Sequence, residues 1–317
     1  MGAKRQNNRN ELHRIRRLLE EAIKSDLDRM GILYKISSRI KNDVSLRKKI
    51  ESKGQNHYSE IGKKVTDFIG IRVMTYFISD AEIFFDYFKG KEECRRDDIS
   101  DNKKELGVDK FKPVRKNLIM DIPQSHKEKL KEILKNIATS NNDYNLIDAA
   151  YELQFRTVFS EGWHEVEHLL RYKNQSDWEA FNTENRMLNS IYAALESHDM
   201  ALDILFNELA HRHYMKGNLQ AMMKMKYRLN FKDEDMSEEI LSLLNGQHEL
   251  AKLIHEYDRN EFMTGIANGK YKFKDNEITL DHTACLIVSI DHRLENPKAA
   301  KLSERNLKIV EKYIPSK

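Results

Sequence analysis

Glycine and proline are scarce in this sequence: the chain has 317 residues but only 12 glycines and 4 prolines. Because these two residues form most tight turns, a sandwich of many short strands would need more of them. Charged side chains make up 33% of the chain, which suits long helices with one solvated face. The sequence therefore predicts a fold that is rich in helices.

Strand-like segments occur in the first two-thirds of the chain. They are the runs 31–41, 71–78, 117–122 and 149–157, which alternate in polarity or concentrate β-branched and aromatic side chains. Apolar residues recur at helical spacing in 9–30, 43–53, 125–137, 160–172 and 183–215, and Asp80 is placed to cap a further helix. We expect an α+β fold, with a mixed central β-sheet flanked by helices. Residues 91–109 show no period and are expected to form a loop.

A soft domain boundary is expected near residue 217, where Gly217 and Asn218 can end the last long helix. Residues 1–216 would then form the α+β domain. Residues 217–317 would form a mainly helical C-terminal region, whose role the sequence does not define. The oligomeric state, including a homo-oligomer, is likewise left open.

The composition excludes several classes of protein. A formal net charge of +3 rules out a strongly basic nucleic-acid coat, although local basic patches are compatible with it. The two cysteines, Cys94 and Cys285, are far apart, which argues against a disulfide framework and favours a reducing compartment. The N-terminus lacks the apolar core of a secretory signal, and no run approaches the ~20 apolar residues of a membrane span. We expect a soluble, cytoplasmic protein.

The first group of candidate functional residues lies on the N-terminal strand. Arg39 and Lys41 are two residues apart in the run 31–41, so both project from one face of the expected strand. A short basic helix that contains Lys49 follows. Taken alone, these cations are typical of a solvated surface.

A second group pairs Asp67 with Arg72 at the start of the apolar run 71–78. An arginine inside such a run is costly unless it meets an anion. One interpretation is a structural salt bridge between the two side chains. The other gives Asp67 a Mg²⁺ ion and Arg72 a phosphate group.

A third group consists of Glu152, Gln154 and Arg156, which share one face of the run 149–157. Three polar side chains in a row can simply face water. A glutamate beside a metal-binding aspartate can instead share the metal or orient an attacking hydroxyl group.

A fourth group, His164-Glu165-x-x-His168, has the pattern of a zinc protease. Histidines four residues apart share a helix face and can bind Zn²⁺. However, Glu167 puts a charge where such helices normally present an apolar residue, and so short a pattern often arises by chance. A zinc protease is kept as a minor alternative.

The order of these segments resembles the synthetase domain of RelA/SpoT-type alarmone synthetases, over roughly residues 10–215. That domain shows S-R-x-K, D-x-x-G-x-R, E-x-Q-x-R-T and W-x-x-x-E-H followed by Y-K. Each piece alone is weak, but the series in this order is specific. This chain has Ser38-Arg39-Ile40-Lys41, Asp67 to Arg72, Glu152 to Thr157, Trp163 with Glu167-His168, and Tyr172-Lys173.

The resemblance implies a nucleotidyltransferase-like synthetase domain and a GTP diphosphokinase-like enzyme of the stringent response. Such an enzyme transfers the β,γ-pyrophosphate of ATP to the 3′-hydroxyl of GDP or GTP, makes a (p)ppGpp-type alarmone and uses Mg²⁺. The residue roles that the resemblance implies are ATP binding by Arg39, Lys41, Lys49 and Arg72, Mg²⁺ binding by Asp67 and Glu152, activation of the acceptor hydroxyl by Glu152, and support of the acceptor side by Gln154, Arg156 and His168.

One departure from the family concerns the acceptor. The family has a G-Y-x-S-x-H segment whose tyrosine stacks on guanine, and the corresponding residues 111–118 lack both the tyrosine and the histidine. A basic group that includes Lys112 and Arg115 stands there instead and would suit phosphates. Two alternatives follow: a toxin that pyrophosphorylates the 3′ end of tRNA, and a degenerate module that binds nucleotides without catalysis.

Overall fold

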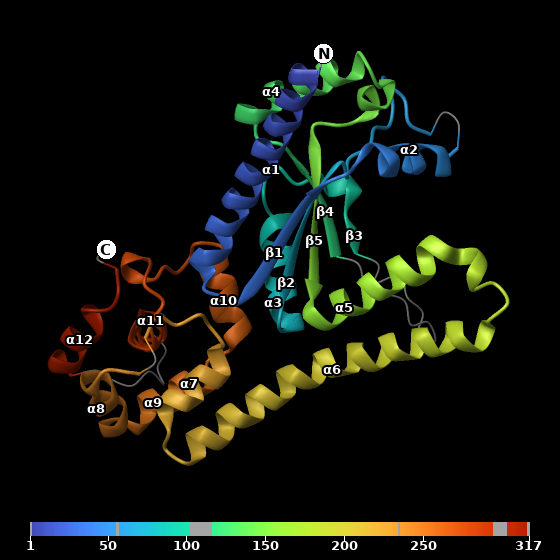
Figure 1. The fold of residues 1–317 in the computed structure, drawn as a ribbon. Coiled ribbons are helices and arrows are strands. Elements are labelled where there is room, and N and C mark those ends of the chain that lie inside the picture. Colours follow the sequence, from blue (N-terminus) through green and yellow to red (C-terminus); the bar gives the residue numbers. More distant parts are fainter. Residues whose placement is uncertain (1, 55–56, 102–115, 234, 294–302, 316–317) are drawn as a thin grey trace. The chain divides into compact units, whose positions relative to one another are not determined.

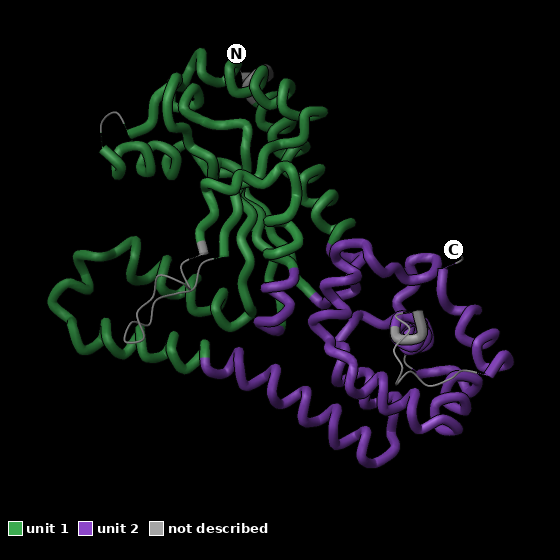
Figure 2. The backbone as a smooth tube through the Cα atoms, turned by 180° about the vertical axis from the view of Figure 1, so that it is seen from behind, with its two compact units in different colours: residues 1–26, 34–76, 84–196 green, residues 27–33, 77–83, 197–317 purple. Residues whose placement is uncertain are grey.

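The computed structural model describes residues 2–54, 57–101, 116–233, 235–293 and 303–315. By its internal packing the chain forms two compact units (Figure 2). Unit 1 comprises residues 1–26, 34–76 and 84–196, and unit 2 comprises residues 27–33, 77–83 and 197–317. The division after residue 196 comes earlier in the chain than the boundary expected near residue 217. A separate domain over 217–317 stays a prediction.

Unit 1 is built on a five-stranded sheet with the order β1-β2-β5-β4-β3 (Figure 1). β2 and β5 are parallel and the other neighbours are antiparallel, so the sheet is mixed, as the sequence predicts. The short strand β3 falls in a region expected to be a loop, and that expectation is wrong there. The strands are β1 (Tyr34–Ile40), β2 (Ile69–Thr75), β3 (Ser100–Asp101), β4 (Lys116–Asp121) and β5 (Ala150–Thr157).

The helices confirm a helix-rich α+β fold. Among the described residues, no helix combines the length and apolarity that crossing a membrane requires. The helices are α1 (Gly2–Met30), α2 (Asp43–Ser52), α3 (Ile78–Lys89), α4 (Gln124–Ala138), α5 (Val158–Val166), α6 (Asn182–Met215), α7 (Leu219–Tyr227), α8 (Glu238–Gly246), α9 (His248–Glu256), α10 (Arg259–Ala267), α11 (Leu280–Arg293) and α12 (Glu304–Glu311).

One face of the sheet carries the apolar core of unit 1. On β5, Leu153 and Phe155 are buried, and they alternate with the polar side chains of Glu152 and Gln154. The ring of Phe155 packs against two aromatic rings of α3, with centroid distances of 6.0 Å to Phe85 and 5.8 Å to Phe88. Because α3 covers this face, the polar side chains of β5 project from the other one.

The turn from β5 into α5 is capped. Thr157 accepts a hydrogen bond from the backbone N–H of Ser160, and the Ser160 hydroxyl accepts one from the N–H of Thr157. The helix expected over 160–172 is not continuous. α5 ends at Val166 and continues as a π-helical turn (Glu167–Arg171) and a 3-10 helix (Tyr172–Asp177). π-helical turns of this kind are frequent at functional sites.

Unit 2 contains a buried ion pair. Asp80, expected to cap a helix, is instead in the first turn of α3 with its side chain 1% exposed. Its carboxylate Oδ1 lies 2.6 Å from Nη2 of Arg259, whose side chain is 6% exposed. The capping prediction was wrong because the carboxylate of Asp80 instead pairs with Arg259, which is distant in the sequence.

Replacing Asp80 with asparagine should lower the free energy of unfolding by about 3–5 kcal/mol, because Arg259 would keep its charge but lose its buried counter-ion. Chemical denaturation measures the effect. The matched control is Glu277→Gln, which removes an exposed pair with Lys232 and should leave the midpoint nearly unchanged. Equal effects of the two substitutions would contradict this account.

Candidate active site

The strand register of unit 1 gathers polar side chains into two adjacent rows on the open face of the sheet. In the first row, Arg39 of β1 pairs with Gly70 of β2, which pairs with Glu152 of β5. Side chains two residues apart on a strand share a face, so the next row lies on the same side. That row is Ser37, Arg72, Gln154 and Asn117.

Side chains of these rows line one side of a cavity of about 210 Å³. Asp67 reaches it from the segment just before β2, and Glu152 reaches it from β5. The two carboxylates, which are 85 positions apart in the sequence (152 − 67), therefore open onto one space on the same side of the sheet. The lining residues are Ser37, Ser38, Arg39, Asp67, Gly70, Arg72, Glu152, Gln154 and Glu165.

Asp67 is the most charge-compensated carboxylate of this cavity. Its Oδ2 lies 3.2 Å from Nζ of Lys41 and 2.5 Å from Nζ of Lys49. Burial by itself would raise the pKa of Asp67, but the charges of Lys41 and Lys49 outweigh burial and hold the pKa below its ordinary value. Its other oxygen, Oδ1, is buried and has no hydrogen-bond partner among the described residues. Asp67 thus offers an ionised oxygen with free coordination capacity.

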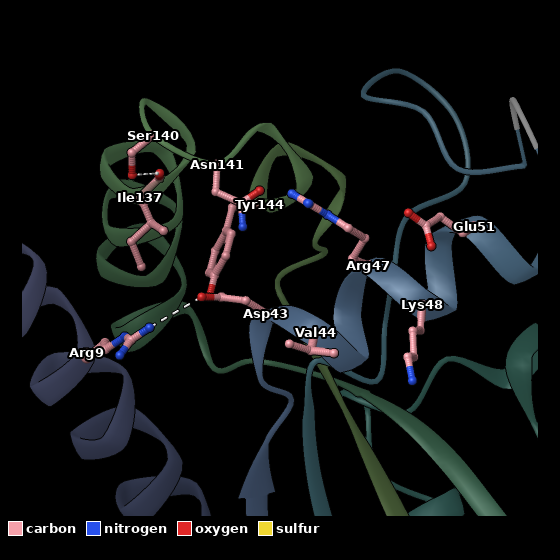
Figure 3. A pocket seen from close by; sticks show the side chains of 10 residues that line it. All are labelled: Arg9, Asp43, Val44, Arg47, Lys48, Glu51, Ile137, Ser140, Asn141 and Tyr144. Carbon is pink, nitrogen blue, oxygen red and sulfur yellow. Dashed lines mark hydrogen bonds and ion pairs between the residues drawn. The ribbon is translucent and has the colours of Figure 1, made fainter. Parts of the chain in front are cut away.

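Lys41 and Lys49 reach Asp67 from different elements. Lys41 directly follows β1, whose last residue is Ile40, and its backbone N–H donates to the carbonyl of Phe68 at 2.8 Å. Lys49 lies in the last turn of α2. The two basic residues before it on α2, Arg47 and Lys48, line a different cavity of about 490 Å³, in which Asp43 accepts hydrogen bonds from Tyr144 and Arg9 (Figure 3).

Glu152 is oriented by two amide side chains. Its Oε1 accepts a hydrogen bond from Nδ2 of Asn117 at 2.9 Å, and its Oε2 accepts one from Nε2 of Gln154 at 2.7 Å. Gln154 in turn accepts a hydrogen bond from Nε of Arg72 at 3.0 Å. The chain of bonds fixes the glutamate, since neither oxygen is free to rotate without losing a partner.

Arg72 does not pair with Asp67, so the structural salt bridge considered for these two residues is wrong. Its Nη1 contacts the carboxylates of Glu161 and, at 2.8 Å, Glu165, which lie four residues apart on α5. Burial raises the pKa of Glu161 in spite of Arg72, whereas the hydrogen bond from Arg72 lowers the pKa of Glu165. The difference follows exposure, since the Glu161 side chain is 13% exposed and that of Glu165 is 48%.

The other candidates lie around the cavity. Arg39 is exposed at its edge. Arg156 is buried beside Glu161 and does not line the cavity. His168 also lies outside the lining, on the π-helical turn, where burial and the charges of Lys173 and Arg39 lower its pKa. Lys112 and Arg115 lie outside the described residues.

The geometry does not support a zinc protease. The rings of His164 and His168 stack with centroids 5.8 Å apart, and Glu165 between them is bound to Arg72. A zinc site needs at least three protein ligands. Within the ranges that the structure describes, no group of three or more His, Cys, Asp and Glu side chains is arranged to hold a metal ion.

The sequence analysis did not identify the two carboxylates that pair with Arg72. Glu161 and Glu165 have helical i, i+4 spacing directly after the Glu152 strand, which was the available signal. Asn117, the orienting partner of Glu152, begins a predicted strand, but its register could not be known from the sequence.

Residues 38–177 match the model of the region found in RelA / SpoT proteins. This stretch contains β2 to β5, the last residues of β1, the Asp67 segment and α5. It therefore includes every lining residue of the sheet cavity except Ser37. Residues 38–177 of this chain are thus similar to the region that RelA and SpoT proteins share. None of the curated proteins compared with the chain matches it.

Solved structures that match part of this chain include small alarmone synthetases. Small alarmone synthetase 2 from Bacillus subtilis matches with 18% identity and a TM-score of 0.42, over 63% of this chain and 94% of that one. Small alarmone synthetase 1 from the same organism, bound to its product pppGpp, matches with 19% identity and a TM-score of 0.44, over 62% and 94%. A GTP pyrophosphokinase family protein from Streptococcus pneumoniae matches with 16% identity and a TM-score of 0.42, over 68% and 93%.

The carboxyl group of Asp67 should titrate below the ordinary aspartate pKa of about 3.9, because Lys41 and Lys49 stabilise its charged form. Carbon-13 NMR of the side-chain carboxyl groups measures the titration, and Asp67→Asn identifies the resonance. A lowered pKa stabilises the fold above pH about 3.9, and this stabilisation is lost as the pH falls through the folded-state pKa. Stability should therefore fall more steeply in acid for the wild type than for Asp67→Asn, and equal slopes would argue against the ion pairs.

Proposed function

We propose that this chain is a pyrophosphokinase, which transfers the β,γ-pyrophosphate of ATP to the 3′-hydroxyl of a guanosine nucleotide, GDP or GTP. The product would be a (p)ppGpp-type alarmone. The observation that carries the proposal is the shared cavity of Asp67 and Glu152 beside four cations, Arg39, Lys41, Lys49 and Arg72. The similarity of residues 38–177 to the region that RelA and SpoT proteins share supports the same chemistry.

The donor set fits Mg²⁺. The ion prefers oxygen ligands and is usually held by one or two carboxylates together with substrate phosphates. Asp67 Oδ1 is buried without a hydrogen-bond partner among the described residues, which suits a metal ligand. Asp67 and Glu152 would hold the ion, and its chemistry would be to neutralise charge on the transferred phosphates.

Three cations near Asp67 would bind the triphosphate of ATP. Lys41 and Lys49 bring two ammonium groups to the carboxylate of Asp67, and each is a compact point charge of the kind that binds phosphate. Arg39 is exposed at the edge of the cavity and has a planar guanidinium, which suits either a phosphate or the face of a base. Phosphoryl-type transfer depends mainly on such positioning and charge stabilisation.

Glu152 is the proposed general base. Its carboxylate is held by Asn117 and Gln154, and it would accept the proton of the acceptor 3′-hydroxyl. The hydroxyl oxygen then forms a bond to the β-phosphorus of ATP, the bond from that phosphorus to the α,β-bridging oxygen breaks, and AMP leaves with that oxygen. The proton ends on Glu152 and is returned to solvent.

The cavity holds only part of both substrates. Its volume of about 210 Å³ is below the range of roughly 300–1,000 Å³ typical of small-molecule sites. The acceptor would therefore lie largely outside this cavity. By the family resemblance Lys112 and Arg115, which lie outside the described residues, would contribute to its binding. Because the guanine-stacking tyrosine is absent from 111–118, the 3′ end of tRNA is the second candidate acceptor. The cytoplasm, which supplies both substrates, is the compartment that this proposal requires.

Replacing Glu152 with glutamine should reduce pyrophosphate transfer on the order of a hundredfold, because the general base and metal ligand is lost while the amide keeps its shape. Asp67→Ala should have a similar effect. The purified chain is incubated with Mg²⁺, γ-labelled ATP and, separately, GDP, GTP or deacylated tRNA, and the labelled product identifies the acceptor. Glu128→Gln, on the exposed face of α4, is the matched control and should keep full activity.

The same assay separates the alternatives. Label in GDP or GTP supports the alarmone synthetase, whereas label in tRNA alone selects the tRNA-modifying toxin. Tight ATP binding without transfer to any acceptor would overturn the enzyme assignment and leave a nucleotide-binding module. Full activity of Glu152→Gln would remove this residue from the mechanism.

Replacing Glu165 with glutamine should lower the KM for ATP by up to about fivefold with little change in kcat. The half-exposed Glu165 competes with the ligand for Arg72, and an exposed pair of this kind contributes about 0.2–1 kcal/mol. Steady-state kinetics at saturating acceptor measure both constants. A fall in kcat with unchanged KM would instead show that Glu165 positions Arg72 for the reaction.

A further inference from the structure

Unit 2 contains a cavity of its own, with a volume of about 380 Å³, and two buried arginines line it. Arg228 and Arg259 are each 6% exposed. Buried arginines are rare unless every N–H group finds an acceptor. The hydrogen bonds of these two residues therefore show whether the cavity is a finished structural core or an open binding site.

Arg259 lacks one acceptor. Its Nε donates to the carbonyl of Tyr227 at 3.0 Å, and its Nη2 donates to Asp80 at 2.6 Å. Its Nη1 is buried and has no hydrogen-bond partner among the residues that the structure describes. A buried donor left without an acceptor costs stability, so the fold retains it at a loss.

Arg228 is also incompletely bonded, and its backbone is strained. It pairs with Asp203 at 2.8 Å and lies over the ring of Phe77, but its Nε finds no acceptor within the described ranges. It ends α7 in the left-handed conformation with φ 53° and ψ 39°, where glycine is usual. A strained residue with an unsatisfied buried donor is a reason to look for a ligand.

A third cation, Lys226, stands at the same cavity. Burial lowers the pKa of Lys226 to about 8, although the nearby carboxylates of Asp258 and Glu256 oppose the shift. The pKa of Arg228 is also lowered, first by burial and then by the charge of Arg259. Burial therefore disfavours the charge of both cations, and a bound anion would have to compete with the carboxylates of Asp203, Glu256 and Asp258, which also line the cavity.

We propose that the cavity of unit 2 binds a small molecule through a phosphate group, with Arg228 Nε and Arg259 Nη1 donating to its oxygens and Lys226 adding positive charge. Phosphate suits this site because guanidinium groups bind its oxygens with directed hydrogen bonds. The volume lies within the range of small-molecule sites, so a phosphate that carries a further group fits as well. The site is separate from the cavity on the sheet, and its existence does not depend on the proposed reaction.

Isothermal titration calorimetry of the full chain with inorganic phosphate, and separately with ribose 5-phosphate, tests the site at constant ionic strength. Arg228→Lys, which keeps the charge but loses Nε, and Lys226→Gln should each raise the Kd at least tenfold. Two controls should leave it unchanged: Lys49→Gln at the sheet cavity, and Lys232→Gln in an exposed ion pair. Arg259 is left intact because its loss would leave the buried carboxylate of Asp80 without a counter-ion.

The outcomes are distinct. Equal affinity for phosphate and ribose 5-phosphate shows a site for free phosphate, and tighter binding of ribose 5-phosphate shows a site for a phosphate ester. Binding that is lost only in Lys49→Gln belongs to the sheet cavity and overturns the proposal, as does the absence of saturable binding. If Arg228→Lys or Lys226→Gln has a lowered melting temperature, the Kd of the other variant tests the proposal, since the two alter different residues of the cavity.

Discussion

The candidate site depends on the parallel pairing of β2 with β5. In its register Gly70 stands beside Glu152, and Arg72 stands beside Gln154. The side-chain hydrogen bond from Arg72 to Gln154 repeats the same alignment on the open face. A slip of one residue would turn every side chain of β5 to the opposite face. Glu152 would then enter the aromatic packing of α3, and Phe155 would enter the cavity.

Opposite charges already meet in the site before any substrate arrives. Asp67 lies against Lys41 and Lys49, and Arg72 lies against Glu161 and Glu165. The desolvation of these groups is therefore part of folding. The proposed nucleotide would exchange ionic partners with them and would not have to strip water from isolated charges. Such an arrangement fixes the positions of the charged groups.

Local patterns in the sequence predicted most of unit 1, but not the interactions between its elements. Alternation on β5 correctly placed Glu152 and Gln154 opposite Leu153, and the segment order indicated the resemblance to RelA and SpoT proteins. The sequence analysis did not predict the partners of Arg72, the role of Asp80 or the strand β3, because each depends on residues that are distant in the sequence. The π-helical turn after Val166 also has no local signature, since its residues show ordinary helical spacing.

Gly70 lines the cavity with no side chain, at a strand position where a larger residue would stabilise the sheet. It is not among the glycines with a positive φ, so the strand backbone there would accept any residue. A β-carbon at this position would lie 3.9 Å from Cγ of Arg39, which is ordinary contact and no clash. Glycine weakens a strand interior relative to residues with side chains. Selection for stability alone would therefore favour a larger residue at position 70. Glycine keeps the cavity open at this point, at the expense of the stability of the sheet.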